Sequence, residues 1–181
     1  MDGLGPRWGG FRVGGAGSIS HTAAMLDDDL VTVTAEPVDS AHARQLIDDL
    51  GADLLARYGE ADPQFGPLDP DVVADGGVFL VARDGGRPVG CAAILRTDEA
   101  LAEVKRVYVE SGARGRGIGL ALMAELERQA RGRGYRRLRL ETGDGQPEAV
   151  GLYARCGYEV IPCWGRYADR GWSICMAKDV G

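Results

Sequence analysis

The chain has 181 residues, of which 45% are hydrophobic, so it is long enough for one domain with a buried core. Its formal net charge of −6 at pH 7 argues against a general nucleic-acid or anionic-membrane surface. Four scattered cysteines without a CxxC pair, and two histidines, predict neither a metal site nor a disulfide scaffold. We find no apolar run of the roughly 18 residues that span a bilayer and no signal-peptide core, and we expect a reducing cytoplasm.

The first part of the chain differs in composition from the rest. Residues 1–29 are rich in glycine and serine and show no sustained apolar periodicity. We therefore expect a disordered or non-native arm, with Met25 as an alternative start, ahead of a domain over 30–181. The sequence does not decide whether residues 1–24 are native.

From residue 30 onward, short segments in which apolar and polar residues alternate are interspersed with segments of helical periodicity. LVTVTAE predicts a strand over 30–36, and Ser40 is placed to cap a helix over 41–59 whose apolar residues recur at helical spacing. A short helix is expected around 70–74. The same criteria predict the remaining elements in chain order: a hairpin of strands over 78–83 and 88–96 joined by the turn DGGR, a strand over 103–109, a helix from the loop RGRGIG to about 132, a strand over 136–142, a helix over 147–157, and strands over 158–161 and 171–178.

The loop RGRGIG, residues 114–119, weakens the helix that it begins, because glycine is a poor helix former. Unpaired N–H groups and the helix dipole make such an N-terminus attractive to phosphate, and glycine lets a phosphate approach the backbone. Arg114 and Arg116 can add charged contacts. A dinucleotide fingerprint would need glycine where the chain has Leu120, and a Walker loop would need Gly-Lys-Ser/Thr. A merely flexible turn is the remaining alternative.

Two motifs together carry a family resemblance. Arg114, Gly117 and Gly119 meet the pattern [Gln/Arg]-x-x-Gly-x-[Gly/Ala], and LYARCGY supplies a helical Tyr153 ahead of Gly157 and an aromatic residue. In this order, with one strand between them, they resemble the GNAT superfamily of acetyl-CoA-dependent N-acetyltransferases. The resemblance extends over about 30–178, and its specific part is 103–158.

The resemblance implies an α/β (α+β) single domain whose central twisted sheet is mixed, mostly antiparallel, and splayed near residue 109, with helices on its flanks. It places coenzyme A in the splay. Gln146 stands where the family often has an asparagine that contacts the coenzyme. The residues expected at the coenzyme are Val107, Tyr108 and Val109 along the pantetheine arm, Arg114, Gly115, Arg116, Gly117, Ile118 and Gly119 at the pyrophosphate, and Gln146.

Glu103 and Tyr153 are the catalytic candidates that the resemblance implies. Glu103 would take a proton from the acceptor amine, and a period of two puts it on one face with Lys105, Val107 and Val109. The alternative for Glu103 is an ion pair with Lys105 or Arg106 at a strand end. Tyr153 would protonate the leaving thiolate, and its alternative is a core tyrosine.

The expected function is transfer of acetyl from acetyl-CoA to a primary amine of a small molecule or protein by direct attack, without a metal. The backbone N–H of Val109 would polarise the thioester carbonyl. The alternatives are a non-catalytic acyl-CoA-binding sensor and a phosphate-binding module for nucleotides.

The acceptor itself is not named by the sequence, and its determinants are expected in 40–75 and 162–172. We expect neither nucleic acid nor membrane as a partner, because the six arginines between 128 and 139 fit a solvated helix end in an acidic chain. A homodimer and the acyl-chain preference are left open.

Overall fold

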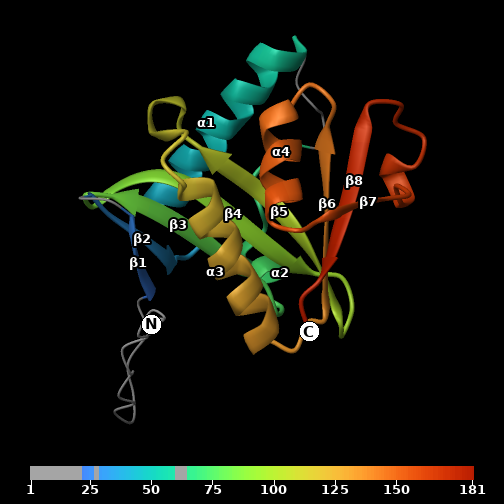
Figure 1. Ribbon diagram of the computed structural model, residues 1–181, viewed down its shortest axis with the longest axis horizontal. Coiled ribbons are helices and arrows are strands. Elements are labelled where there is room, and N and C mark those ends of the chain that lie inside the picture. Colours follow the sequence, from blue (N-terminus) through green and yellow to red (C-terminus); the bar gives the residue numbers. More distant parts are fainter. Residues whose placement is uncertain (1–21, 27–28, 60–64) are drawn as a thin grey trace, which may run out of the picture.

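A computed structural model describes residues 22–26, 29–59 and 65–181 of the chain. Its strands form one eight-stranded sheet with helices on both faces (Figure 1). The strands are β1 (Thr22–Leu26), β2 (Asp29–Ala35), β3 (Val78–Asp84), β4 (Arg87–Arg96), β5 (Leu101–Val109), β6 (Arg137–Gly143), β7 (Glu159–Ile161) and β8 (Ser173–Asp179). The helices are α1 (Ala41–Tyr58), α2 (Pro70–Ala74), α3 (Ile118–Gly132) and α4 (Pro147–Arg155), with 3-10 turns η1 (Ser111–Ala113) and η2 (Gly165–Tyr167).

The strand order is β1-β2-β3-β4-β5-β6-β8-β7, and neighbouring strands are antiparallel except for the parallel pair β5 and β6. That parallel pairing covers Leu101 to Glu103 of β5, although β5 continues to Val109. The two strands therefore separate beyond Glu103. The predicted mixed, splayed sheet is confirmed, and the separation begins well before residue 109.

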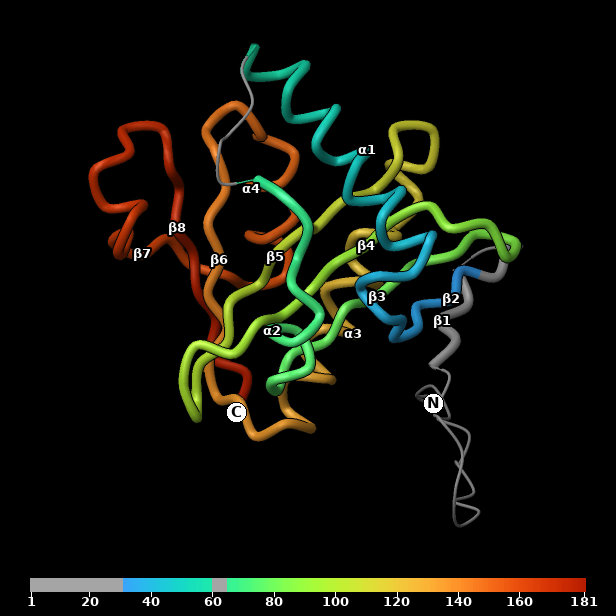
Figure 2. Tube along the Cα trace, turned by 180° about the vertical axis from the view of Figure 1, so that it is seen from behind, coloured from blue at the N-terminus to red at the C-terminus, as the bar shows by residue number. Residues whose placement is uncertain are grey.

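The two faces of the sheet carry separate hydrophobic clusters. The first cluster lies under α3 and α4, and the second lies under α1 and α2, which Figure 2 shows from behind. Five α3 side chains of the first cluster are fully buried: Ile118, Leu122, Met123, Leu126 and Ala130. Helix α3 is thus held by packing along its length, and its N-terminus is left to face the gap beside β5.

Local signals in the sequence account for several boundaries. The Ser40 hydroxyl accepts a hydrogen bond from the Ala43 N–H at 3.1 Å, which caps α1 as predicted. In the β3–β4 hairpin, Gly85 and Gly86 have φ values of 55° and 86°, a conformation that the two-residue turn requires.

The N-terminal arm differs from expectation where the structure describes it. Residues 22–26 form β1, which pairs with β2 in an antiparallel register, although the sequence predicts no element there. Strand β1 is only five residues long and is held by hydrogen bonds to the edge of β2. The sequence TAAML does not alternate between apolar and polar residues, so periodicity did not predict this strand. Residues 1–21 and 27–28 lie outside the described residues, so the boundary of the arm stays a prediction.

Candidate active site

Two cavities meet in the gap between β5 and β6. The smaller cavity, of about 400 Å³, lies between the N-terminus of α3, helix α4 and the C-terminal half of α1. The larger cavity, of about 890 Å³, is bounded by α1, residues 65–67, β5, β6 and the segment 166–172. Both cavities are lined by Leu50, Val107, Gln146 and Tyr153. These residues mark the junction of a continuous cleft that passes through the splay.

The smaller cavity gathers most of the residues that the sequence predicts at a coenzyme. Arg116 is the exception, because its guanidinium turns away and pairs with Asp84, with Nη2 3.2 Å from Oδ1. The predicted residues that line the smaller cavity are Val107, Tyr108, Val109, Arg114, Gly115, Gly117, Ile118, Gly119 and Gln146.

The glycines of the loop have distinct structural roles. Gly117 is the N-cap of α3 with φ 81°, and Gly115 has φ 79°, so both lie in the left-handed region that favours glycine. A Cβ on Gly119 would come within 3.1 Å of Leu152 Cδ2, so this glycine allows α3 and α4 to approach closely. No side chain caps α3, and its first-turn N–H groups have no partner within the helix. The loop therefore presents backbone donors to the smaller cavity.

An ion-pair cluster, absent from the sequence prediction, crosses the smaller cavity from α1 to α4. Asp53 Oδ2 accepts from Arg57 Nε at 2.8 Å, and Asp53 Oδ1 pairs with Arg114 Nη2 at 3.2 Å. Arg57 also pairs with Glu148 at the start of α4. Burial by itself would raise the pKa of Asp53, but hydrogen bonds from Arg57 and Arg114 outweigh it and hold that pKa below its usual value. The i,i+4 spacing of Asp53 and Arg57 was the one local signal of this cluster.

Tyr153 lies at the junction of the two cavities. Its side chain projects from α4, is 6% exposed, and packs against the Tyr158 ring at a centroid distance of 6.1 Å. Burial raises the pKa of Tyr153, so its hydroxyl keeps its proton at neutral pH. A protonated tyrosine hydroxyl therefore lies at the junction of the two cavities.

The predicted common face of Glu103, Val107 and Val109 is wrong. The register of β4 and β5 shifts by one residue between Cys91 and Ala93, and Arg106 of β5 has φ 55°. This β-bulge adds one residue and reverses the alternation, so Glu103 lies on the α1 side while Val107 and Val109 pack on the α3 side. Periodicity alone does not reveal a bulge.

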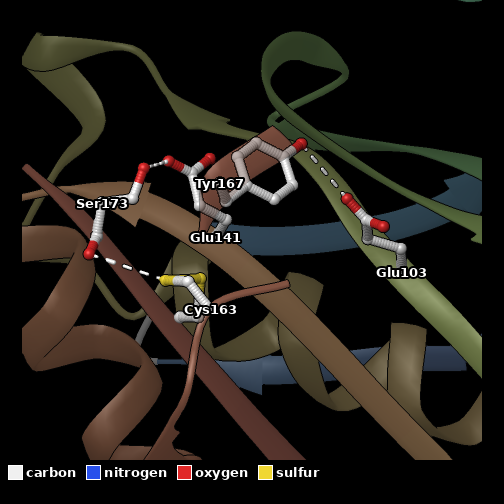
Figure 3. The surroundings of a disulfide bond; sticks show 6 residues. Glu103, Glu141, Cys163, Tyr167 and Ser173 are labelled. Carbon is white, nitrogen blue, oxygen red and sulfur yellow. Dashed lines mark hydrogen bonds between the residues drawn. A yellow bond between two sulfur atoms is a disulfide. The ribbon is translucent and has the colours of Figure 1, made fainter. Parts of the chain in front are cut away.

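Glu103 belongs to a polar group centred on Tyr167 of η2, which is 4% exposed and lines the larger cavity. The Tyr167 hydroxyl accepts from Lys105 Nζ at 2.6 Å and from Arg166 Nη2 at 2.8 Å. It donates to Glu103 Oε1 at 3.4 Å, as Figure 3 shows. Glu103 Oε1 also pairs with Lys105 at 2.5 Å, which is the ion pair considered as its alternative role. Glu103 therefore reaches the larger cavity through Tyr167.

The segment 162–172, in which we expect acceptor determinants, lines part of the larger cavity, and its role at an acceptor stays a prediction. It supplies the aromatic and cationic wall of the larger cavity, together with α1, whereas the short helix α2 does not line it. The residues of this segment that line the cavity are Arg166, Tyr167, Arg170 and Trp172.

The cysteine prediction needs correction, because Cys163 and Cys175 form a disulfide with a Cα–Cα distance of 5.2 Å. Cys163 lies at the start of the segment 162–172, and Cys175 lies in β8, opposite Glu141 of β6. Sequence spacing did not indicate the pair, because β7 and β8 bring the two residues together only in the folded sheet. The reducing compartment stays a prediction.

The other two cysteines, Cys91 and Cys156, are free thiols. Burial raises the pKa of the Cys91 thiol to about 12.

Reduction of this disulfide is expected to speed tryptic cleavage after Arg166 and Arg170 several-fold, because the segment between the two cysteines then loses its covalent closure. The measurement is mass spectrometry of a limited digest with and without dithiothreitol, with cleavage after Arg133, the residue that follows α3, as the internal reference. A double variant, Cys163→Ser with Cys175→Ser, should be cleaved quickly in both conditions. Equal rates for the wild type, or four titratable thiols in the unreduced denatured protein, would contradict this expectation.

Within the described residues, no helix is long and apolar enough to cross a membrane. The same part of the chain holds no group of three or more His, Cys, Asp or Glu side chains arranged to bind a metal ion.

The chain is similar to known proteins in sequence and in fold. The acetyltransferase (GNAT) family model matches residues 43–158. An IAA acetyltransferase from Azospirillum brasilense is 37% identical over 101 residues, which are 55% of this chain and 66% of that protein. An uncharacterized N-acetyltransferase from Schizosaccharomyces pombe is 35% identical over 46% of this chain and 52% of its own length. The chain thus spans between half and two thirds of the length of these curated relatives.

Solved structures extend the comparison to the whole fold. A Klebsiella pneumoniae protein whose proposed activity is that of an acyl-CoA N-acyltransferase is 33% identical, with a TM-score of 0.72 over 83% of this chain and 98% of that one. A GNAT acetyltransferase from Elizabethkingia anophelis, solved with acetyl-CoA bound, is 17% identical over 82% of this chain and 97% of its own, with a TM-score of 0.59, and shares the fold. Because the family model covers more than half of the chain, the chain belongs to the GNAT acetyltransferase family.

Proposed function

We propose that the chain transfers the acetyl group of acetyl-CoA to a primary amine by direct attack. The observation that carries this proposal is the junction of two cavities at Tyr153, one bordered by the glycine loop and the other open to an acceptor. The acetyl-CoA held by the Elizabethkingia protein of the same fold supports the choice of donor.

The residues of the smaller cavity fit the anionic part of coenzyme A. The first-turn N–H groups of α3 and the guanidinium of Arg114 supply donors for a pyrophosphate. The carboxylates of Asp53 and Glu148 in the same cavity both pair with Arg57, which limits their repulsion of phosphate. Val107 to Val109 lie along the open side of β5, where an extended pantetheine arm can follow the strand.

In the proposed reaction the amine nitrogen bonds to the thioester carbonyl carbon, and the carbon–sulfur bond breaks as the amide forms. The Tyr153 hydroxyl gives its proton to the departing sulfur. The proton lost by the amine goes to the Tyr167 hydroxyl, which passes its own proton to Glu103; Glu103 then releases that proton to solvent, and Tyr153 regains one from solvent. The N–H of Val109 is the proposed donor to the carbonyl oxygen. Helix α1 lines both cavities, so amine and thioester would be held side by side, which removes much of the entropic barrier.

The test is an amine panel incubated with acetyl-CoA, with free thiol and the mass of the acetylated amine both recorded. The proposal predicts equal amounts of the two products for at least one primary amine. A non-catalytic sensor would be stabilised against heating by coenzyme A without releasing thiol on any amine, and a nucleotide module would be stabilised by ATP or NAD instead.

Replacing Asp53 with asparagine is expected to tighten coenzyme A binding several-fold, because a partly exposed carboxylate that competes for Arg114 is removed from the anion site. The measurement is isothermal titration calorimetry. Asp49→Asn is the matched control, since Asp49 lies one turn earlier on α1, pairs with Gln45 and lines neither cavity. Weaker binding by Asp53→Asn than by the control would show that Asp53 positions the arginines instead of competing with the ligand.

A further inference from the structure

A primary amine loses two protons when it is acetylated near neutral pH. Its pKa is ordinarily about 10, so it reaches the protein as an ammonium ion and becomes a nucleophile only after the first proton has left. The second proton leaves after attack, and in the proposed function, on which this inference rests, it passes through Tyr167 to Glu103. Glu103 is poorly placed for the first proton, because it pairs with Lys105 and with Arg139 and lines neither cavity.

A second glutamate, Glu141 of β6, lies at the open edge of the splay. The pairing of β5 with β6 ends with Glu103 opposite Arg139, and Glu141 follows Arg139 by two residues on the same face of β6. The pairing of β6 with β8 continues past Glu141 in an unshifted register, so no bulge turns this side chain to the other face. The half-buried Glu141 therefore faces the larger cavity, which it lines together with Tyr153.

One oxygen of the Glu141 carboxylate is held in place and the other is left for a ligand. Oε1 accepts a hydrogen bond from Ser173 Oγ at 2.6 Å, a contact that Figure 3 shows. Among the described residues, no cation pairs with Glu141 and no donor contacts Oε2. Burial is the main cause of the raised pKa of Tyr153, and Cys156 and the charge of Glu141 add to it. The Glu141 carboxylate thus lies within electrostatic range of the proposed acid.

The other charged side chains of the larger cavity do not occupy Glu141. The cations are Lys105, which pairs with Glu103; Arg106, which donates to the Gly66 carbonyl oxygen at 2.7 Å; and Arg166 and Arg170, which lie over the Tyr167 ring. The carboxylates of Asp48 and Asp144 also line the cavity, but both residues are exposed, and solvent weakens an ion pair at such a position. Glu141 is therefore the better anchor for a cationic group near Tyr153.

We propose that Glu141 binds the acceptor as an ammonium ion and takes the proton that the amine must lose before it attacks. An ammonium N–H donates to Oε2 of Glu141, the proton moves to that oxygen, and the neutral amine is left beside Tyr153 and the thioester. Glu141 then releases the proton to solvent. Glu103 releases the second proton and Tyr153 regains one, so an ammonium ion and a thioester become an amide, a thiol and one released proton.

The pH dependence of turnover by Glu141→Gln tests this role, with an amine that the panel shows to be acetylated. The substitution removes the charge but keeps an oxygen that can accept from Ser173, so the melting temperature should stay close to wild type. At about pH 7, kcat/KM for the amine should fall about 10²-fold or more. From about pH 6 to pH 8 the kcat/KM of the variant should rise nearly tenfold per pH unit, because the variant acts only on neutral amine. The wild type acts on the ammonium ion, so its kcat/KM should change little.

Glu159→Gln is the matched control, since Glu159 is an exposed glutamate of β7 that lines neither cavity. This variant should keep the rate and the pH profile of the wild type. A wild-type rate for Glu141→Gln would overturn the proposal and leave acetyl transfer standing. A loss of the same size at every pH would also overturn it, because a structural defect does not depend on the protonation of the amine.

If no amine is acetylated, the proposed function fails separately, and binding then tests the Glu141 site. Calorimetry at neutral pH, in the presence of coenzyme A, compares phenethylamine, an ammonium ion, with phenethyl alcohol, its neutral counterpart. The wild type should bind the amine about tenfold or more tightly than the alcohol, and Glu141→Gln should lose that preference. Equal affinities of the wild type for the two compounds, or an unchanged preference in the variant, would reject the ammonium site.

Discussion

Tyr153→Phe is expected to lower kcat for acetyl transfer about 10²-fold or more, the usual range for loss of a general acid. The ring remains and keeps its packing against Tyr158, so the melting temperature and coenzyme A affinity should stay close to wild type. Because burial raises the pKa of Tyr153, its own ionisation should not cut activity below about pH 10, the ordinary value for tyrosine. The measurement is steady-state kinetics over a pH series with an amine found in the panel.

Tyr158→Phe is the matched control for this variant. Tyr158 belongs to the same buried cluster, is 3% exposed and lines neither cavity, and its hydroxyl has no hydrogen-bond partner among the described residues. Removing that hydroxyl takes away an unsatisfied polar group, so stability should hold or rise and turnover should not change. Equal, wild-type rates for Tyr153→Phe and Tyr158→Phe would make Tyr153 a core residue and reject its catalytic role.

Gly117→Val is expected to weaken coenzyme A binding by about 1 to 3 kcal/mol, or roughly 5- to 150-fold, if one or two anion contacts are lost. A β-branched residue is strained at φ 81°, and its side chain would stand at the N-cap from which the α3 donors face the smaller cavity. The measurement is the dissociation constant from calorimetry, together with the melting temperature.

Gly134→Val separates ligand binding from backbone strain. Gly134 follows the other end of α3, has φ 86°, and offers open space to a Cβ. Both variants should therefore lose stability to a similar degree, but Gly134→Val should bind coenzyme A like the wild type. A common loss of affinity in the two variants would mean that strain in α3, and not the phosphate site, accounts for the effect.

The sequence predicts the fold well because its signals are local. Alternation, the Ser40 cap and the paired glycines of the hairpin each act within a few residues, and each is found where it was expected. The glycine loop and Tyr153 line the same cavity, as the two family motifs predicted. The exact depth of the splay was not predictable, because it depends on how far β5 and β6 pair.

What sequence reasoning missed depends on contacts between distant segments. The bulge at Arg106 changes which side of the sheet Glu103 faces, and a repeating pattern gives no sign of one extra residue. Arg57 and Glu148 are 91 positions apart, and Cys163 meets Cys175 only after β7 and β8 pair. Glu103 itself remains the predicted base, but the proton would now reach it through the Tyr167 hydroxyl.

The most direct test of the account is a crystal structure of the protein with coenzyme A. The account predicts the pyrophosphate at the first-turn N–H groups of α3, the pantetheine arm beside Val107 to Val109, and the sulfur next to the Tyr153 hydroxyl. It also predicts that Arg116 stays paired with Asp84. Coenzyme A bound with its pyrophosphate away from α3, or with its sulfur on the far side of the sheet from Tyr153, would contradict the account.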